Sequence, residues 1–530
     1  DGTITILDAA TETAVLTSDA TGIPGVDAAV RFQSSGEGTE YWVIVDAIGT
    51  GVGSYTLKID AEPEVFRVFY PAGFTGPSIR EFVSLANPNS FDITYSVILR
   101  YETGERDQTI VSNVTLAAGS RGGVTISDAL NGSPVGARIA PYAIEVQAIG
   151  GPIAASMGHF DFGSTTGDAF TSTISPIWSL ARLERNPGSV SDFILYFNPH
   201  DFDVNITLTA YNSAGDAINV TTTVEALRRG GLNLEQVLNL PTGIFGAVVT
   251  AEPVDAANDA VFQGIIVGQS HYDLVNDSGF GMLGDPLGGA LRGAVPSMVQ
   301  GNGTTSELVL FNPNPFVTTI TLSGQYVRAD LPNLARIVTL NSGQTITLSG
   351  TELGLINGQP LGISYTSSFP VTVMGNQIQY GDADAAAAAT QAGTGWFFGA
   401  AFMNSQLAGE SYFETLAFYN PANTATEISV ELFFLDGTNE VLNLNVGAGQ
   451  FAETRLHEII GSDFEDNTNR PSNFDPNEIL GRPGLSYFSM FVSAPSPIAV
   501  SFTHYDLFLQ GGWTNSGAAL GLINPISTIV

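Results

Sequence analysis

The chain has 530 residues, of which 44% are hydrophobic and 10% aromatic, and this is enough material for several packed cores. It carries 18 basic and 52 acidic residues, and its net charge of −34 would repel phosphate backbones and anionic lipid, so nucleic acid is not an expected partner. The lack of cysteine excludes disulfides, thiolate catalysis and cysteine-ligated zinc, and no apolar run approaches the roughly 18 residues of a membrane span. We therefore expect an acidic, multidomain protein from the cell exterior.

Residues 1–62 differ from the rest of the chain. They contain an acidic turn before the strand "AVRF" (29–32), then "GTEYWVIVD" (38–46) and a closing "GSYTLKI" (53–59). These features resemble the latter half of the bacterial pre-peptidase C-terminal domain, a small β-sandwich appended to secreted proteases and surface proteins. The resemblance implies export and a non-catalytic accessory role, with the family's opening strands expected ahead of Asp1.

The remainder is a fourfold repeat. The segments "FVSLANP", "FILYFNP", "LVLFNP" and "TLAFYNP" share one pattern, and their asparagines lie 111, 114 and 108 residues apart at Asn87, Asn198, Asn312 and Asn420. This spacing is typical of one small β-sandwich. Each run predicts a strand that ends at Asn-Pro, because proline lacks the ladder donor and asparagine favours turns.

Further alternating runs and turns follow each asparagine, and they predict six or seven short strands per copy. No helical period is sustained, so we expect an all-β chain of four tandem immunoglobulin-like sandwiches of about 110 residues after a partial sandwich. The architecture resembles the immunoglobulin-like modules of bacterial surface proteins. The expected repeats span 66–163, 177–280, 293–385 and 396–510, followed by an extended tail at 511–530.

A His-aromatic-Asp phrase closes copies one, two and four, at His159, His271 and His504. In copy three the phrase "IQYGD" places Gln379 where the other copies carry histidine. A metal or acid/base site is one interpretation. Because histidine alternates with apolar residues and glutamine is a poor metal ligand and no general base, we favour a core-facing structural residue at the end of the last strand.

Acidic residues crowd one loop of copy four, "GSDFEDNTNRPSNFDPNE" (461–478), and could hold a structural calcium ion through Asp463, Glu465, Asp466, Asp475 and Glu478. The spacing is not that of an EF-hand, so a solvated loop is the competing interpretation. The segment "DADAAAAAT" (382–390) is expected to be a linker, with Asp382 and Asp384 as weaker calcium candidates. No other cofactor is expected.

The tail is apolar at Leu520, Leu522, Ile523, Ile526, Ile529 and Val530. We expect it to complete a sandwich of the next subunit by strand addition, which would give a head-to-tail homopolymer. Two alternatives remain, namely that the tail folds back onto copy four or that flanking residues of a longer polypeptide complete both end modules.

The chain carries no nucleophile elbow, zinc-protease helix or P-loop, so we expect no enzyme. Tandem sandwiches supply length rather than chemistry, which favours a structural protein of the cell surface that forms a stalk, layer or filament. The first alternative is an adhesin or glycan-binding protein that uses loops at the sandwich ends. The second is an accessory region of a secreted hydrolase.

Overall fold

The protein is described by a computed structural model. It covers residues 2–8, 14–19, 41–47, 65–76, 78–131, 139–162, 164–379, 381–404, 412–434, 437–456, 485–506, 511–515 and 518–525. The chain divides into two compact units, Asp1–Glu62 and Pro63–Val530. The first contains an antiparallel sheet in the order β2-β1-β3, formed by Ala14–Asp19, Gly2–Asp8 and Tyr41–Ala47. The predicted strands "AVRF" and "GSYTLKI" lie outside the described residues, so the family resemblance stays a prediction.

The second unit contains four repeats. Repeat 1 consists of β4 Val65–Tyr70, β5 Arg80–Ala86, β6 Ile93–Tyr101, β7 Gln108–Leu116, β8 Arg121–Thr125, α1 Ile126–Asn131, β9 Tyr142–Ile149, β10 Ala154–Asp161 and β11 Ser164–Thr166. Repeat 2 consists of β12 Ile177–Arg185, β13 Val190–Phe197, β14 Val204–Tyr211, β15 Ala217–Val224, β16 Arg229–Asn233, the 3₁₀ turns η1 Leu234–Gln236 and η2 Ala256–Asn258, β17 Gly243–Pro253, β18 Ile266–Asp273 and β19 Ser278–Leu283.

Repeats 3 and 4 follow the same plan with fewer, longer strands. Repeat 3 consists of β20 Ala290–Met298, β21 Thr305–Phe311, β22 Thr318–Tyr326, β23 Leu334–Leu340, β24 Thr345–Ser349, α2 Gly350–Leu353, β25 Leu361–Gln379 and β26 Asp382–Ala387. Repeat 4 consists of β27 Gln391–Asn404, β28 Tyr412–Tyr419, β29 Thr426–Phe434, β30 Asn439–Val446, β31 Phe451–Arg455, β32 Leu485–Asp506 and β33 Gly511–Asn515, and β34 Ala518–Pro525 follows it. In these two repeats β25 and β32 each run through both sheets and replace two separate strands.

Each repeat is a sandwich of two antiparallel sheets with one topology. Numbered within a repeat, strands 1, 6, 3 and 4 form one sheet and strands 5, 2, 7 and 8 form the other, as in β4-β9-β6-β7 and β8-β5-β10-β11. Strand β14 shows why the sequence folds this way, because Val204, Ile206 and Leu208 are fully buried while the alternating polar residues are half-exposed. Burial of each such side chain contributes about 1.5–3 kcal/mol.

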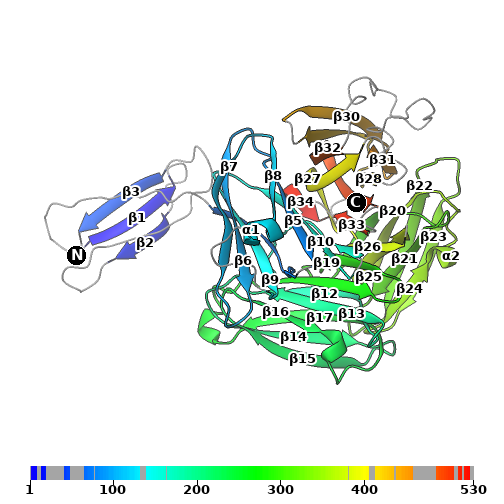
Figure 1. Ribbon diagram of the computed structural model, residues 1–530, viewed down its shortest axis with the longest axis horizontal. Helices are drawn as coiled ribbons and strands as arrows, with labels where there is room; N and C mark the ends of the chain where they lie inside the picture. Colours follow the sequence, from blue (N-terminus) through cyan, green and yellow to red (C-terminus); the bar gives the residue numbers. More distant parts are fainter. Residues whose placement is uncertain are drawn as a thin grey trace. The chain divides into compact units, whose positions relative to one another are not determined.

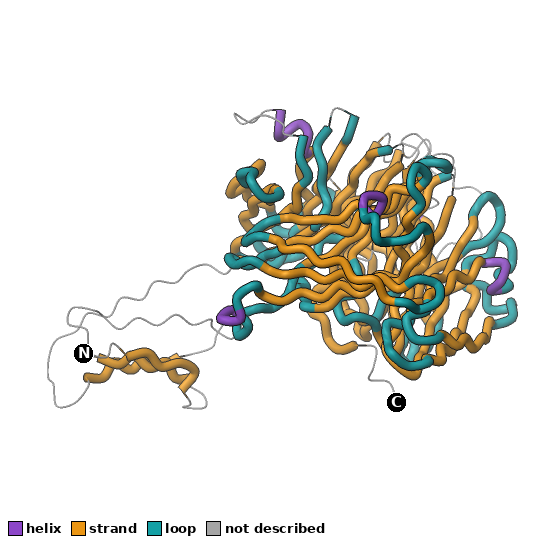
Figure 2. Tube along the Cα trace, turned by 90° about the horizontal axis from the view of Figure 1, so that it is seen from below, coloured by secondary structure: helices purple, strands orange, loops and turns teal. Residues whose placement is uncertain are grey.

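The predicted all-β sandwich fold is confirmed, and the described helices are short segments between strands, of which α1 with six residues is the longest (Figure 2). Two details of the prediction are wrong. Repeats 1 and 2 have eight strands rather than six or seven, because a short strand follows the closing phrase, whereas repeats 3 and 4 have seven because β25 and β32 each replace two strands. The supposed linker at 382–390 begins with β26, which pairs with the end of β25. Among the described residues, no helix has the length and hydropathy needed to cross a membrane.

Each of the four repeats packs against the next, and repeat 4 packs against repeat 1. Apolar clusters join repeat 1 to repeat 2 through Phe69 and Phe197, and repeat 2 to repeat 3 through Phe280 and Phe311. Repeat 4 packs against repeat 1, where Phe397 contacts small alanines and the Gly399 amide donates to Ser156 Oγ at 3.2 Å. The last strands β11, β19, β26 and β33 contact each other in turn, and Figure 1 shows β19, β26 and β33 near the middle of the unit. The repeats therefore form a closed ring of contacts.

Candidate functional site

The four repeat-marking asparagines are completely buried and make the same hydrogen bonds. The Asn198 Nδ2 group donates to the carbonyl oxygens of Phe202, Val224 and Glu225 at 2.8, 3.3 and 3.0 Å, and Asn198 Oδ1 accepts from the His200 amide at 3.0 Å. Equivalent sets surround Asn87, Asn312 and Asn420. Each asparagine thus satisfies the backbone where strand 2 leaves its sheet, which is a structural task.

The three histidines are buried and face an acid on strand 2. The distance from His159 Nδ1 to Glu81 Oε1 is 2.6 Å, and from His504 Nδ1 to Glu414 Oε1 it is 2.9 Å. His271 Nδ1 lies 3.5 Å from Asp192, which already accepts hydrogen bonds from Gln269 and from the Glu184 amide. These pairs lie inside the sandwiches with internal partners.

The predicted counterpart in repeat 3 is wrong by two residues. The acid of each pair lies six residues before the repeat-marking asparagine, and in repeat 3 that position is Ser306. Ser306 pairs with Gln377 across the sheet and not with Gln379, and Ser306 Oγ lies 3.3 Å from Gln377 Oε1. The phrase "IQYGD" matches the motif by residue type only, because its aspartate, Asp382, belongs to the next strand, β26. Repeat 3 therefore replaces the acid–histidine pair with a neutral one.

The equivalent histidines are expected to respond differently to replacement by glutamine. Burial lowers the pKa of His159, but hydrogen bonds and charges of Asp161 and Glu81 outweigh this effect and raise the pKa to about 9. A raised folded-state pKa means that the stabilisation is complete below pH 6.5, the ordinary value, and is lost as the pH rises through about 9. We expect His159→Gln to cost about 1.5 to 3 kcal/mol at pH 6 and much less at pH 10.

His271→Gln serves as the matched control. It should cost less than about 1 kcal/mol, because Asp192 keeps its other donors. Thermal unfolding followed by circular dichroism at both pH values measures the difference. Equal losses for the two variants, or a His159→Gln loss that does not change with pH, would contradict the assignment of a charged His159.

Asp382 joins all four repeats. Its Oδ1 accepts from Ser164 Oγ of repeat 1 at 3.0 Å, from the Gly279 amide of repeat 2 at 2.9 Å and from its neighbour Ala383 at 2.9 Å. Its Oδ2 accepts from the Thr165 amide at 3.3 Å and from the Gly512 amide of repeat 4 at 2.8 Å. Both oxygens thus face hydrogen-bond donors, which is unsuited to a calcium ion.

The other predicted sites are resolved only in part. Asp384 accepts from the Tyr505 hydroxyl at 2.6 Å, and no group of three or more acidic, histidine or cysteine side chains that could hold a metal ion occurs in the described ranges. The calcium candidates Asp463, Glu465, Asp466, Asp475 and Glu478 lie outside those ranges.

The predicted assembly tail forms β34, which pairs with β27 of the same chain. Leu520 and Leu522 lie opposite Gly395 and Gly393, and Ile523 belongs to the same strand. Ile526, Ile529 and Val530 lie outside the described residues. This arrangement corresponds to the alternative in which the tail folds back onto copy four.

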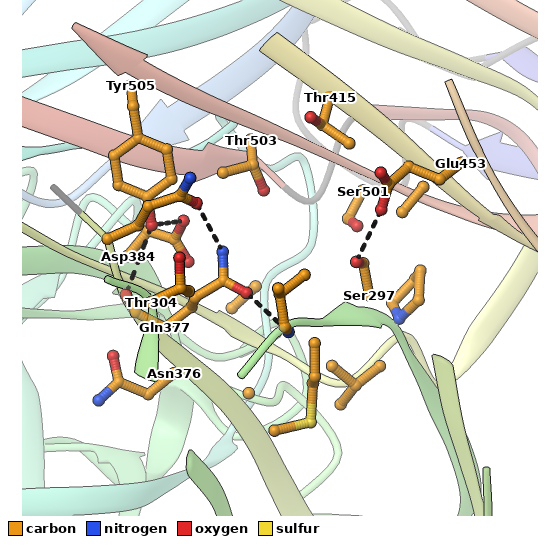
Figure 3. A pocket seen from close by; sticks show the side chains of 18 of the residues that line it. Ser297, Thr304, Asn376, Gln377, Asp384, Thr415, Glu453, Ser501, Thr503 and Tyr505 are labelled. Atoms are coloured by element: carbon orange, nitrogen blue, oxygen red, sulfur yellow. Dashed lines mark hydrogen bonds between the residues drawn. The ribbon is translucent and has the colours of Figure 1, made fainter. Parts of the chain in front are cut away.

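A pocket of about 430 Å³ with a mixed polar and apolar lining lies between repeats 3 and 4 (Figure 3). On one side Ser297 Oγ donates to Glu453 Oε2 at 3.2 Å, and Glu453 Oε1 accepts from Arg455 at 2.8 Å. On the other side lie Asp384 and Tyr505. The polar side chains labelled in Figure 3 are those of Ser297, Thr304, Asn376, Gln377, Asp384, Thr415, Glu453, Ser501, Thr503 and Tyr505.

The same place between repeats 2 and 3 is filled with apolar side chains. Strand 8 of repeat 2 contributes Phe280 and Met282, and the facing sheet of repeat 3 contributes Val309 and Met374. These four side chains are at most 3% exposed and belong to one cluster. This part of the interface is therefore a packed apolar cluster, and polar contacts such as the ion pair of Arg182 with Glu307 at 2.8 Å join the same two repeats beside it.

The sheet registers show what replaces these residues at the pocket. In repeat 2, Phe280 lies opposite His271 and Met282 lies opposite Gln269. In repeat 3, Gln377 and Gly375 take the places of His271 and Gln269. The residues opposite them are Asp384 and Ala386. Val309 lies three residues before Asn312 and pairs with Met374. Its equivalent, Ala417, lies three residues before Asn420 and pairs with Ser501. Smaller side chains at four equivalent positions, two of them polar, therefore open the pocket.

The sequence analysis missed this pocket. The replacement of Val309 by Ala417 could have been found by aligning the repeats on their asparagines. The replacements of Met374 by Ser501 and Phe280 by Asp384 could not, because they require the correct register of strands 7 and 8, and the register chosen in repeat 3 was wrong by two residues.

Comparisons with known proteins do not assign a family. No protein-family model matches the chain, and no curated protein matches it. Among solved structures, Thermotoga maritima 1070 is 18% identical over 17% of this chain and 82% of its own, with a TM-score of 0.16. A tetra-tandem repeat from the extending region of a large adhesion protein is 14% identical over 82% of this chain and 92% of its own, with a TM-score of 0.11. The Bacteroides uniformis β-glucuronidase 2 is 10% identical over 47% of this chain and 27% of its own, with a TM-score of 0.12.

Proposed function

We propose that the protein is a non-catalytic binding protein of the cell exterior that holds a small polar ligand in the pocket between repeats 3 and 4. One observation carries this proposal, namely that the contact between repeats 3 and 4 holds a hollow with a mixed polar and apolar lining at the place where an apolar cluster fills the contact between repeats 2 and 3. Hollowing a packed interface costs stability, because large-to-small replacements leave cavities. The pocket volume also falls within the roughly 300–1,000 Å³ range of small-molecule sites.

The surroundings of the acidic groups support a non-catalytic role. Asp382 is held by five donors, Asp384 by the Tyr505 hydroxyl, and Glu453 by Arg455 and Ser297. Because these three carboxyl groups already accept hydrogen bonds from the chain itself, we assign them a structural task. The acidic, cysteine-free composition supports a place outside the cell.

A thermal-shift screen of the full chain against neutral, cationic and anionic small molecules tests the proposal. A ligand that binds only the folded state stabilises it by RT ln(1 + [L]/Kd), which is about 2.7 kcal/mol at 100 times Kd. We expect at least one compound to raise the Tm of the native chain. The proposal fails if no compound of any class does so.

A structural role as a filament subunit is the second candidate, and it would require β34 to leave β27 of its own chain and pair with a neighbouring copy. β34 is the last strand of its sheet, in the order β30-β29-β32-β27-β34. A terminal strand at a sheet edge can be exchanged between copies. We expect the intact protein to form oligomers and a chain without residues 517–530 to stay monomeric in light scattering. A monomeric intact protein at high concentration would contradict the filament.

A further inference from the structure

The pocket between repeats 3 and 4 offers hydroxyl groups on both walls. Ser297 comes from repeat 3, and Thr415 and Ser501 come from repeat 4. Within the described part of the chain, the hydroxyls of Thr415 and Ser501 have no hydrogen-bond partner, so they are available to a ligand. Serine and threonine hydroxyls both donate and accept, which suits a ligand whose own groups do the same.

The charges of the pocket disfavour an anionic ligand, and the carboxylate that could attract a cation, that of Asp384, already accepts from the Tyr505 hydroxyl at 2.6 Å. Glu453, whose side chain is 8% exposed, is neutralised by Arg455 at 2.8 Å, so it provides no isolated charge for a cation. An anion would meet Glu453 and Asp384 within a chain of net charge −34. The Glu453–Arg455 pair places an acceptor beside a set of donors, which matches two neighbouring hydroxyl groups of one ligand.

The same pocket has an apolar part. Val295, Met298 and Ala417 line it together with the polar groups. Sites for small molecules combine such an apolar surface with a few placed polar groups that fix orientation. A ligand with a ring of C–H groups edged by hydroxyls satisfies both parts of this lining.

We propose that the pocket binds a neutral sugar unit, with Ser297, Glu453, Arg455 and Ser501 contacting its hydroxyls and Val295 and Ala417 contacting its C–H surface. This inference rests on the proposed function and names its ligand class. It accounts for the exchange of Val309 and Met374 for Ala417 and Ser501 at the equivalent positions, because the exchange supplies both space and a hydroxyl.

The repeats themselves provide the test variants. Ala417→Val with Ser501→Met gives the pocket the side chains that fill the interface between repeats 2 and 3. We expect this variant to fold with an unchanged or higher Tm and to lose at least tenfold in affinity. The matched control, Val309→Ala with Met374→Ser, should lower the Tm and leave the affinity unchanged. Glu453→Gln, which removes one charge without filling the pocket, should also weaken binding and keeps the test valid if the filled variant does not fold.

Isothermal titration calorimetry of the full chain with glucose, galactose, mannose and N-acetylglucosamine measures binding, with glucuronic acid and glucosamine as charged comparators. We expect at least one neutral sugar to bind with a Kd of about 1 mM or tighter, and the charged comparators to bind more weakly. Equal binding to the filled variant, or no binding of any neutral sugar, would overturn the inference. A charged or zwitterionic compound that binds only the unfilled pocket would overturn it while leaving the proposed function intact.

Discussion

The Asp382→Asn variant is expected to melt far below the native protein. The amide oxygen can accept from Ser164, Gly279 and Ala383, but the amide NH₂ group then faces the backbone N–H groups of Thr165 and Gly512. Each buried donor that loses its acceptor costs about 1–3 kcal/mol, so we expect a loss of about 2–6 kcal/mol. The loss should affect unfolding of the whole ring, because these donors belong to repeats 1 and 4.

The size of this effect should depend on pH. Burial raises the pKa of Asp382 to about 7, although its N–H and hydroxyl donors act in the lowering direction. Because the folded protein binds this proton more tightly than the unfolded chain, Asp382 contributes most at low pH, and the contribution is lost as the pH rises from 3.8 to about 7. The difference in Tm between native protein and variant should therefore be larger at pH 5 than at pH 8.

Differential scanning calorimetry at the two pH values measures the effect, with Asp330→Asn as control. Asp330 is exposed and pairs with the exposed Arg328, so this variant should melt at the same temperature as the native protein. A Tm of Asp382→Asn equal to that of the control would show that the junction of β11, β19, β26 and β33 does not hold the repeats together.

The second large effect is expected at the repeat-marking asparagines. In Asn198→Asp the NH₂ group that donates to Phe202, Val224 and Glu225 becomes an oxygen, and a buried carboxylate then faces three carbonyl oxygens. Unpaired buried charges are among the most costly changes in a protein, so we expect a loss of about 3 kcal/mol or more at pH 7.

Asn219→Asp is the matched control, since Asn219 is an exposed residue of β15 in the same repeat. It should unfold at the same urea concentration as the native protein. We expect the Asn198→Asp loss to shrink at pH 3, where the carboxyl group can be protonated. If both variants unfold together at pH 7, the asparagine is a mark of the sequence repeat without a structural task.

The strand pattern and the fourfold repeat could be predicted from the sequence. The alternation in "VNITLTAY" and the stop at Asn-Pro are local signals, because a strand buries every second residue and the turn chemistry depends on neighbouring residues. The burial of the histidines followed from the same alternation, since His504 continues the apolar face of Phe502 and Val500. These features depend on residues that are close together in the chain.

Tertiary structure alone decided the ring, its junction and the pocket. Asp382 seemed part of a linker because its main partners lie far away, with Ser164 218 residues earlier in the chain. The register that assigns Gln377 to Ser306, and Asp384 to the place of Phe280, depends on which strands pair and on the bend of β25 between its two sheets. Alternation specifies which face of a strand is buried, but a shift of two residues preserves that face. Only the paired strands and the packing of one repeat on the next therefore determine where an aspartate joins four repeats and where serine and alanine leave a pocket.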